Sequence, residues 1–443
     1  MKAPRRFQKY DKSNLSWLSE IPAHWKVKRN GALFSQRNET GHAHLPILEV
    51  SLRTGVRVRN FETSKRKQIL SDLTKYKRAA KNDIAYNMMR MWQGAVGIAP
   101  VDGLVSPAYV VARPHIGVNP EYFSFLFRTE QYMSEIDAFS RGIVKDRNRL
   151  YWDQFKQMAS LVPTEDEQAA IVHFLNFAVK RIRRAINAKR KVVDLVNEQR
   201  YAIIRKVISR GIDQKSKLKP SSISWLGDIP VNWQTRRLKY VTRFCYGNAL
   251  PENKRISGET VAFGSNGPVG TSSISNTLAP AIIVGRKGSF GKVTYSERPA
   301  FAIDTTYFID NRNTSNDLKW LYYLLQVIDL DKLSQDTGVP GLSRESAYQK
   351  VVPVPPFETQ REIADALDLG TARIDQIIGR IEGVIRCLVE YQNRLISDVV
   401  TGKIDIRESV ANLPKDIEQL SDDIQDDETP DSEDGLSHNE EQL

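Results

Sequence analysis

The sequence carries two different segments that each occur twice. Ser-Trp-Leu-Ser-Glu-Ile-Pro-Ala-His-Trp at 16–25 returns 208 residues later as Ser-Trp-Leu-Gly-Asp-Ile-Pro-Val-Asn-Trp at 224–233. The segment 162–213 returns without a gap at 354–405, 192 residues later. Between these copies the two halves of the 443-residue chain share little sequence. A chain that repeats its frame and varies its contents predicts one scaffold presenting two different recognition surfaces.

Most of the positive charge lies before residue 413. Residues 413–443 hold twelve acidic residues and one lysine, Lys415, which gives this tail a net charge of −11. Because the whole chain carries +11, residues 1–412 carry +22. Such a basic body is expected to bind a polyanion, since counterions released from phosphates drive association; a merely solubilising basic surface is the alternative. The acidic tail has no aromatic residue and is predicted to be disordered.

The composition also argues against several classes of protein. Only two cysteines occur, Cys245 and Cys387, and neither they nor the six histidines have the spacing of metal ligands. We therefore expect no disulfide framework, no metal site and a reducing, cytoplasmic location. No run of about 18 apolar residues occurs, so no membrane-spanning helix is expected.

No catalytic motif stands out, so no catalytic residue is expected in this chain. The P-loop pattern Gly-x-x-x-x-Gly-Lys-Ser/Thr is absent, which leaves nucleotide hydrolysis unsupported. Asn119-Pro-Glu-Tyr122 is similar to the Asn-Pro-Pro-Tyr element of adenine methyltransferases. However, glutamate replaces the second proline and no glycine-rich methyl-donor loop precedes the motif. We interpret it as the start of a helix.

Both copies of the longer repeat are predicted to form a helix of about 40 residues, a rod of roughly 60 Å. A capping box at Thr164–Glu167, Pro355-Pro356 and the glycines Gly211 and Gly402 mark the expected ends. In the second copy, apolar residues alternate at spacings of four and three, as in a coiled coil, with Gly370, Val384 and Tyr391 also on this pattern. The predicted interface residues are Ile171, Leu175, Ile182, Val196 and Ile203 in the first copy, and Ile363, Leu367, Ile374, Ile377, Ile381, Leu388 and Leu395 in the second.

Neither helix can bury its apolar stripe alone, and the two helices have matching lengths. We therefore predict an intramolecular antiparallel coiled coil with a pseudo-two-fold arrangement. Two helices packed separately, each on its own domain, are the alternative. The predicted fold class is α+β, with two mixed α/β domains joined by the long helices.

The segments between the repeats are predicted to be mixed α/β modules. Short apolar runs separated by glycine, proline and asparagine turns indicate strands. The expected strands lie at 47–52, 104–112, 281–285 and 301–309, and the expected helices at 120–127 and 317–327. The predicted boundaries are 1–160 for the first domain, 161–213 for the central helix, 214–352 for the second domain, 353–407 for the C-terminal helix and 408–443 for the tail.

Basic and glycine-rich loops in both modules supply the candidate DNA contacts. Cations, an indole and amides suit phosphate contact, stacking and hydrogen bonds to base edges, and glycine permits close backbone approach. A plain hairpin turn is the alternative explanation for each loop. The segments 141–149 and 338–344 precede the closing strand of their modules and are predicted to be equivalent surface loops. The candidates are Arg90, Trp92, Gln93, Lys145, Arg147 and Arg149 in the first module, and Asn266, Arg286, Lys287, Ser289, Lys292 and Arg344 in the second.

Taken together, the chain resembles the specificity subunit of type I restriction–modification systems over roughly residues 10–407. The resemblance rests on the doubled Ser-Trp-Leu…Ile-Pro…Trp openings, the Val-Pro…Gln segments at 162–168 and 354–360, and the two long helices. The loops at 89–97 and 284–291 also match family segments. The first copy departs from the usual Pro-Pro-x-x-Glu-Gln by having Val162-Pro-Thr164, and the second has Thr359 before Gln360 in place of the acid.

The resemblance implies a division of labour. Each module would be a target recognition domain that reads one half of an asymmetric, bipartite site in double-stranded DNA. The paired helices would set the gap and dock modification subunits, two of them by expectation, alongside restriction subunits. S-adenosylmethionine, ATP and Mg²⁺ would bind in those partner chains, and no cofactor in this one. The alternatives are a stand-alone DNA-binding regulator and a fused methyltransferase or nuclease with an unrecognised catalytic site.

Overall fold

The chain forms two compact units, each built from one module and parts of both long helices. The computed structural model describes residues 5–52, 54–60, 72–142, 148–213, 215–221, 223, 225–252, 255, 258–333, 341–411 and 413. Unit 1 takes the described residues of Met1–Ala188 and Ile385–Leu443, and unit 2 those of Lys189–Val384. The predicted disordered tail beyond residue 413 lies outside the described residues.

The two units contain four-stranded sheets with the same strand order. In unit 1 the order is β4 (Phe34–Arg37), β11 (Tyr109–Pro114), β8 (Ile84–Asn87) and β9 (Val96–Ile98), all antiparallel. In unit 2 it is β16 (Cys245–Tyr246), β22 (Thr306–Asp310), β19 (Ala281–Gly285) and β20 (Val293–Ser296), again antiparallel. The shared frame therefore extends into the modules, where the sequences have diverged.

Smaller elements repeat as well, and others belong to one unit alone. A two-stranded ribbon opens and closes each module: β3 (Lys26–Arg29) with β12 (Ala159–Val162), and β15 (Gln234–Arg237) with β23 (Val351–Val354). The hairpins β1 (Tyr10–Leu15)–β2 (Leu18–Pro22) and β13 (Leu218–Pro220)–β14 (Asp228–Pro230) precede them. Unit 1 adds β5 (Leu48–Ser51), β6 (Gly55–Val58), β7 (Lys77–Ala79), β10 (Gly103–Val105), α2 (Glu130–Phe139), α3 (Trp152–Phe155) and α8 (Arg407–Val410). Unit 2 adds β17 (Thr260–Gly264), β18 (Gly267–Ser272) and β21 (Phe301–Ala302), and its α6 (Arg344–Gln349) starts 192 residues after α3, at the equivalent position.

The expected strands and helices are present, with two strands divided. The run 104–112 is interrupted by a turn, where Tyr109 N donates to Ser106 O at 2.9 Å. The run 301–309 breaks where Thr306 Oγ1 donates to Ile303 O at 2.7 Å. The helices are α1 (Pro120–Phe127) and α5 (Leu318–Val327), with Asn119 and Asp317 as their N-caps. The interpretation of Asn119–Tyr122 as a helix start is confirmed.

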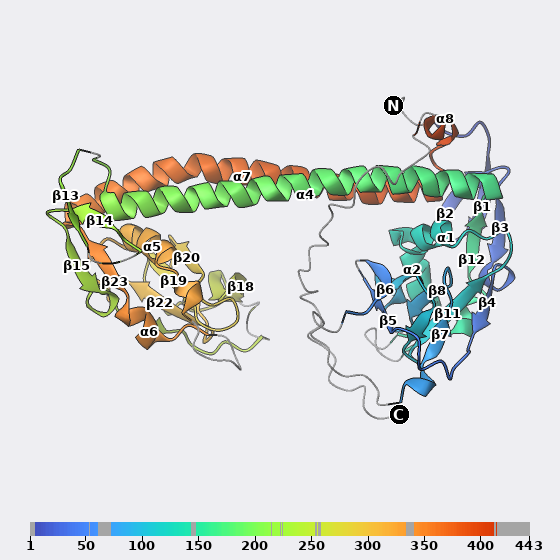
Figure 1. Ribbon diagram of the computed structural model, residues 1–443, viewed down its shortest axis with the longest axis horizontal. Coiled ribbons are helices and arrows are strands. Elements are labelled where there is room, and N and C mark those ends of the chain that lie inside the picture. The colour runs from blue at the N-terminus through green and yellow to red at the C-terminus, as the bar shows by residue number, and fades with distance from the viewer. Residues whose placement is uncertain are drawn as a thin grey trace. The chain divides into compact units, whose positions relative to one another are not determined.

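The repeated segments form two long helices, α4 (Glu165–Arg210) and α7 (Phe357–Val400), which run side by side in Figure 1. The capping box is confirmed, because Thr164 Oγ1 accepts from Glu167 N and the Glu167 carboxylate accepts from Thr164 N, both at 3.3 Å. Unit 1 buries the beginning of α4 against the end of α7, and unit 2 the end of α4 against the beginning of α7. The helices therefore pair antiparallel, as predicted. None of the helices in the described residues is long and apolar enough to cross a membrane.

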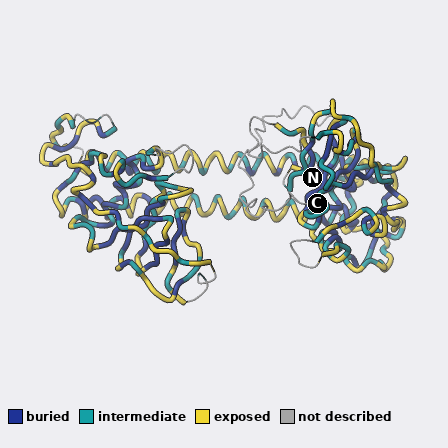
Figure 2. The backbone as a smooth tube through the Cα atoms, turned by 90° about the horizontal axis from the view of Figure 1, so that it is seen from below, coloured by how far each residue is buried: buried dark blue, intermediate teal, exposed yellow. Residues whose placement is uncertain are grey.

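The apolar stripe of α7 differs from the prediction at every second position. The least exposed residues alternate by three and four: Leu367, Thr371, Ile374, Ile378, Ile381, Ile385, Leu388, Gln392, Leu395 and Val399. Ile377, which we had placed in the interface, is 47% exposed, and the neighbouring Ile378 is less exposed. Apolarity alone does not distinguish Ile377 from Ile378, because both are isoleucines. In the structure Ile378 is partly covered, whereas Ile377 is exposed. Figure 2 shows that the middle of both helices is largely exposed.

One buried glutamine has the same role at the start of each long helix. Gln168 Oε1 accepts from Asn119 N at 2.9 Å, and Gln168 Nε2 donates to Pro163 O at 3.1 Å. Gln360 Oε1 accepts from Asp317 N at 2.9 Å, and Gln360 Nε2 donates to Pro355 O at 3.0 Å. The two side chains are 1% and 2% exposed. Each glutamine thus joins its long helix to the N-cap of the module's own helix, which explains why both repeats contain it.

In unit 1 two separate chain segments meet through a hydrogen bond at a position where the chain of unit 2 is continuous. Asp405 N donates to Arg5 O at 2.6 Å, within an isolated β-bridge between these residues. By the two repeat spacings, both residues correspond to Asp213, in the continuous chain between α4 and β13. Nearby, the hydroxyl of Tyr10 donates to Gly402 O at 2.9 Å. The start of the chain therefore completes the unit that contains the end of α7.

Candidate nucleic-acid interface

In both units the candidates that the structure describes gather around the loop that joins the last two strands of the four-stranded sheet. This loop runs from β8 to β9 in unit 1 and from β19 to β20 in unit 2. Its first residue accepts a hydrogen bond from a leucine in or directly after the second basic segment, at 2.8 Å in each case. These bonds are Leu150 N to Met88 O and Leu342 N to Arg286 O. The two basic segments of each module are thus adjacent, and they occupy equivalent positions in the two units.

In unit 1 the β8–β9 loop is held by its apolar residues. Met91 is fully buried, and Gly94 ends the single 3₁₀ turn with φ of +93°. The indole of Trp92 packs partly against the core and donates to Met89 O at 2.9 Å. The loop therefore uses Trp92 as an anchor, which does not favour the stacking role considered from the sequence. Gln93 is exposed and Arg90 half-buried.

The second basic segment of unit 1 starts and ends on a pair of exposed arginines. Arg141 and Arg149 form an antiparallel bridge, with backbone N–H to O distances of 3.0 and 2.9 Å. Lys145 and Arg147 lie outside the described residues. Arg149, the remaining candidate, is placed one residue before the leucine that bonds to the β8–β9 loop.

Unit 2 places two arginines on one tyrosine. The guanidinium carbon of Arg286 lies 4.8 Å from the centre of the Tyr246 ring, and that of Arg344 lies 5.0 Å from it. Arg286 also lies 5.9 Å from the Tyr307 ring centre. Burial, and then the neighbouring Tyr246, raises the pKa of Tyr307 to about 12, so this phenol keeps its proton and donates to Leu342 O at 3.1 Å. The result is a fixed cluster of two cations and two tyrosines.

Two glycines at the ends of the β19–β20 loop serve the protein's own packing, whereas a Cβ on Gly288 would meet no atom within 4 Å. Gly291 has φ of +80°, and a Cβ on it would lie 2.4 Å from Asp331 N. A Cβ on Gly285 would lie 2.4 Å from Ser289 O. At Gly285 and Gly291 the space that a side chain would occupy is therefore filled by backbone atoms of the chain itself. The sequence had suggested a phosphate for this close approach. Between these glycines Lys287 and Ser289 are exposed.

The remaining candidates of unit 2 join the same cluster of loops. Lys292 Nζ donates to the backbone and side-chain oxygens of Asn266, at 2.7 and 2.9 Å. Lys287 forms an isolated β-bridge with Gly341. All six candidates of unit 2 thus lie on three adjacent segments, which are two loops and the start of α6, and Tyr246 and Tyr307 join them. No sequence pattern pointed to the two tyrosines, because they come from strands that are distant in the chain.

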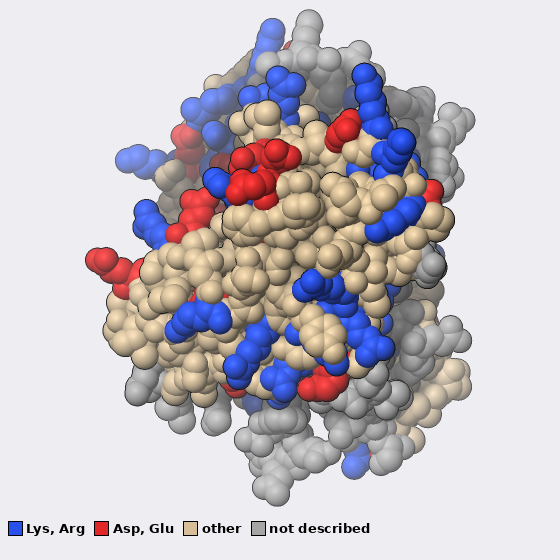
Figure 3. Space-filling view, turned by 90° about the vertical axis from the view of Figure 1, so that its left-hand side faces the viewer, with Lys and Arg blue, Asp and Glu red and all other residues tan. Residues whose placement is uncertain are grey.

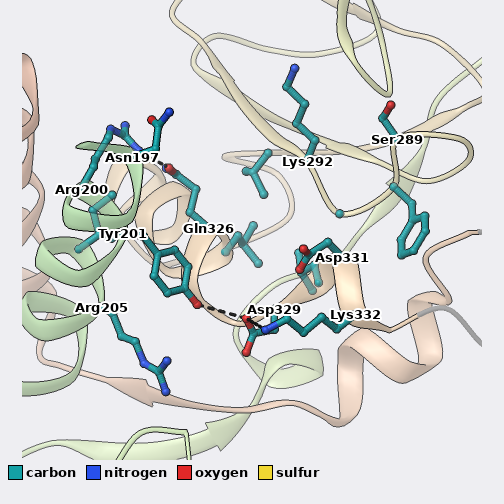
Figure 4. Close-up of a pocket in the computed structure, with 16 residues that line it drawn as sticks. Asn197, Arg200, Tyr201, Arg205, Ser289, Lys292, Gln326, Asp329, Asp331 and Lys332 are labelled. Carbon is teal, nitrogen blue, oxygen red and sulfur yellow. Dashed lines mark hydrogen bonds and ion pairs between the residues drawn. The ribbon is translucent and has the colours of Figure 1, made fainter. Parts of the chain in front are cut away.

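A pocket of about 650 Å³ lies beside the β19–β20 loop in unit 2. It is lined by Ser289–Val293, by α4 residues from Asn197 to Arg205, and by Leu325–Lys332. Figure 4 shows Tyr201 and Lys332 directed at Asp329, and the hydrogen bonds to Asp329 Oδ1 measure 3.2 and 3.1 Å. Arg200 bonds to Gln326 Oε1 and Asp375 Oδ1, both at 3.0 Å. These hydrogen bonds and ion pairs connect Gln326 of α5 and the nearby Asp329 to α4, and they connect α4 to α7.

Positive charge is prominent on the surface of unit 2. Figure 3 views the end of the molecule at the left of Figure 1, and over the lower part of this face Lys and Arg side chains outnumber Asp and Glu. In the described part of the chain, no group of three or more His, Cys, Asp or Glu residues could hold a metal ion. The arrangement suits contact with an anionic polymer.

Comparisons with known proteins point to one class, that of DNA specificity proteins of type I restriction–modification systems. Residues 230–384 match the family model described as "Type I restriction modification DNA specificity domain". The specificity subunit of the EcoBI type I restriction enzyme from Escherichia coli is 23% identical over 125 residues, which is 28% of this chain and 26% of that protein. The matched segment therefore spans about a quarter of the curated relative.

The fold of most of the chain is also found among solved structures. A chain from the study "Structural basis underlying complex assembly and conformational transition of the type I R-M system" shares 15% sequence identity. Its TM-score is 0.59, and the match covers 86% of this chain and 99% of that chain. The resemblance to type I specificity subunits, drawn above from the repeats, is confirmed.

Proposed function

We propose that this chain is the sequence-reading subunit of a type I restriction–modification complex and has no catalytic site of its own. One observation carries the proposal: equivalent loop pairs in the two units are joined by the same backbone hydrogen bond but differ in their side chains. Two unlike loops on one frame suit two unlike half-sites, and the major groove offers the distinct donor and acceptor patterns that such loops can read. The proposed target is an asymmetric, bipartite site in double-stranded DNA.

In this proposal the paired helices set the gap between half-sites and dock the modification subunits. Support comes from apolar side chains of α7 that the helix pair does not cover. Ile377, Val384 and Tyr391 are 47, 43 and 56% exposed and follow one another every seven residues. Residues seven apart lie on one side of a helix, so they form an apolar line suited to a further helix. We name these three residues the outer stripe.

Methylation and cleavage belong, in this proposal, to partner chains that bind S-adenosylmethionine, ATP and Mg²⁺. The complex would contain two modification subunits together with restriction subunits, and it would act on DNA in the cytoplasm. The test is to sequence methylated adenines in cells with and without this chain, in the presence of its native methyltransferase partner. A split, asymmetric motif that disappears with the chain supports the proposal.

Three other results would contradict the proposal. Methylation that persists without the chain removes its role in recognition. Methyl transfer or nicking by the purified chain alone establishes the fused-enzyme alternative. Sequence-specific binding by a chain that never co-purifies with a methyltransferase establishes the solitary regulator.

Docking by the outer stripe has its own test. Ile377→Asp and Val384→Asp should abolish co-purification with the modification subunit while leaving the helix pair folded, because both side chains are exposed. Val231→Asp is the matched control, since Val231 is 52% exposed but lies outside the long helices. Full assembly of the Ile377→Asp chain would remove the outer stripe from the partner interface.

A further inference from the structure

We infer that Arg286 and Arg344 are guanine readers, so that the half-site recognised by unit 2 contains guanine at two positions close together. The inference rests on the proposed function, because it names what one of the two reading surfaces recognises. It starts from the cluster in which both guanidinium groups lie on the ring of Tyr246.

The geometry fixes both arginines before any ligand arrives. Each guanidinium carbon lies about 5 Å from the Tyr246 ring centre, within the range of a cation–π contact. Arg286 Nη1 also donates to Asp304 O at 3.2 Å, and the backbone of Arg286 is tied to Thr305 and Leu342. Arg344 is the first residue of α6, whose N-cap is Ser343. A side chain held in this way has less freedom to lose on binding.

The chemistry of the held groups selects the base. A guanidinium carries several N–H donors in a planar fork, so one bond to a carbonyl leaves donors for a ligand. Guanine presents two acceptors, O6 and N7, side by side in the major groove, and an arginine fork on this pair is the commonest specific contact. Arginine can also bind phosphate, but lysine binds phosphate as a point charge, and the same surface offers the exposed Lys287 for that contact.

The shared tyrosine also limits the distance between the two guanines. Since both guanidinium carbons lie about 5 Å from one ring centre, they are at most about 10 Å apart. Base pairs rise by about 3.4 Å per step, so the two guanines lie within about three steps of each other, on the same or on opposite strands. Tyr246 is a positioning residue in this scheme, and it is 46% exposed.

The experiment compares methylated motifs in cells that express the full-length chain with its native methyltransferase partner. Arg286→Gln and Arg344→Gln keep a long polar side chain but remove the fork that fits guanine. Each variant should lower discrimination for guanine at one position of one half-site by roughly 5- to 150-fold and leave the other half-site unchanged. Tyr246→Ala should relax both positions, whereas Tyr246→Phe, which keeps the ring, should retain them.

Arg236→Ala is the matched control, because this exposed arginine of unit 2 lies on β15, outside the four-stranded sheet. It should leave the motif intact. Thermal unfolding of each purified variant confirms that the chain is folded. Since Tyr246→Phe and Arg→Gln are mild changes, at least one informative variant is expected to fold.

Two outcomes overturn the inference while leaving the proposed function standing. One is a wild-type motif whose unit 2 half contains no guanine on either strand within the allowed spacing. The other is a variant that methylates all sites more weakly with an unchanged motif, which would assign the arginines to the DNA backbone. If the wild-type chain directs no motif at all, the proposed function itself has failed.

Discussion

In unit 1 the loop between β8 and β9 is held by Met91 and Trp92, which pack into the core. In unit 2 the equivalent loop is held by Phe290, which packs partly against the core, by glycines, and by an arginine lying on tyrosine rings. Nevertheless, both loops receive the same backbone hydrogen bond from a leucine. The comparison teaches that the frame fixes where a reading loop lies, and the module's own side chains determine what the loop presents.

Placing a charged side chain in the apolar packing of the long helices should destabilise both units to the same extent. Leu175 on α4 and Leu367 on α7 are equivalent residues of the longer repeat, and both are buried. Leu175→Asp and Leu367→Asp should each lower the free energy of unfolding of their unit by about 3–5 kcal/mol, because an unpaired charge enters an apolar contact. Chemical denaturation of the full chain measures this loss.

Ile377→Asp provides the control for those two substitutions. Ile377 is exposed on α7, so the change should alter the free energy of unfolding by no more than about 0.5 kcal/mol. A large loss in the free energy of unfolding of Ile377→Asp would instead support the sequence prediction that Ile377 lies in the helix interface. Unequal losses at Leu175 and Leu367 would show that the two units do not share one frame.

A smaller loss is expected when the repeated glutamines are removed. Gln168→Ala and Gln360→Ala each leave a buried backbone N–H and a buried carbonyl without their partner. The free energy of unfolding should fall by about 1–3 kcal/mol in each case. Gln199→Ala, at an exposed position of α4, should be nearly neutral. If only one of the two substitutions lowers the free energy of unfolding, the two buried glutamines do not have equivalent roles at the starts of the long helices.

The smallest effect is expected at the exposed loop residues, where the two units should diverge. Lys287→Ala should weaken binding of all DNA sequences modestly and reduce the slope of log affinity against log salt by about one, because one phosphate contact is lost. Gln93→Ala in unit 1 removes no charge and should leave that slope unchanged. Filter binding or fluorescence anisotropy at several salt concentrations compares them. An unchanged slope for Lys287→Ala would exclude the lysine from the DNA interface.

The repeated helices and their ends were predicted well because local sequence patterns specify them. The capping box at Thr164, the start of α1 at Asn119, and the alternation of apolar residues are visible without coordinates. The side of α7 that faces α4 was not predictable at Ile377 and Ile378, since both are apolar and only the partner helix distinguishes them. The helix α2 was missed as well.

The candidate site was predictable by residue type and much less by role. Five of the six candidates of unit 2 lie on two adjacent loops, and the sixth, Arg344, starts the neighbouring helix α6. Tyr246 and Tyr307 were missed because they belong to strands that reach the arginines only after folding. The indole of Trp92 donates to Met89 within its own loop, and its role in stacking on DNA stays a prediction. No local pattern contains that information.

The junction between Arg5 and Asp405 has a consequence for how the protein is made. Unit 2 is one continuous stretch of chain, so it can fold as soon as its last residues leave the ribosome. Unit 1 needs Ile385 and the residues that follow it, which are synthesised after nearly all of the rest. Domains usually fold in the order of their synthesis. Here we expect the first-made module to wait, incomplete, until the end of translation supplies its final helix.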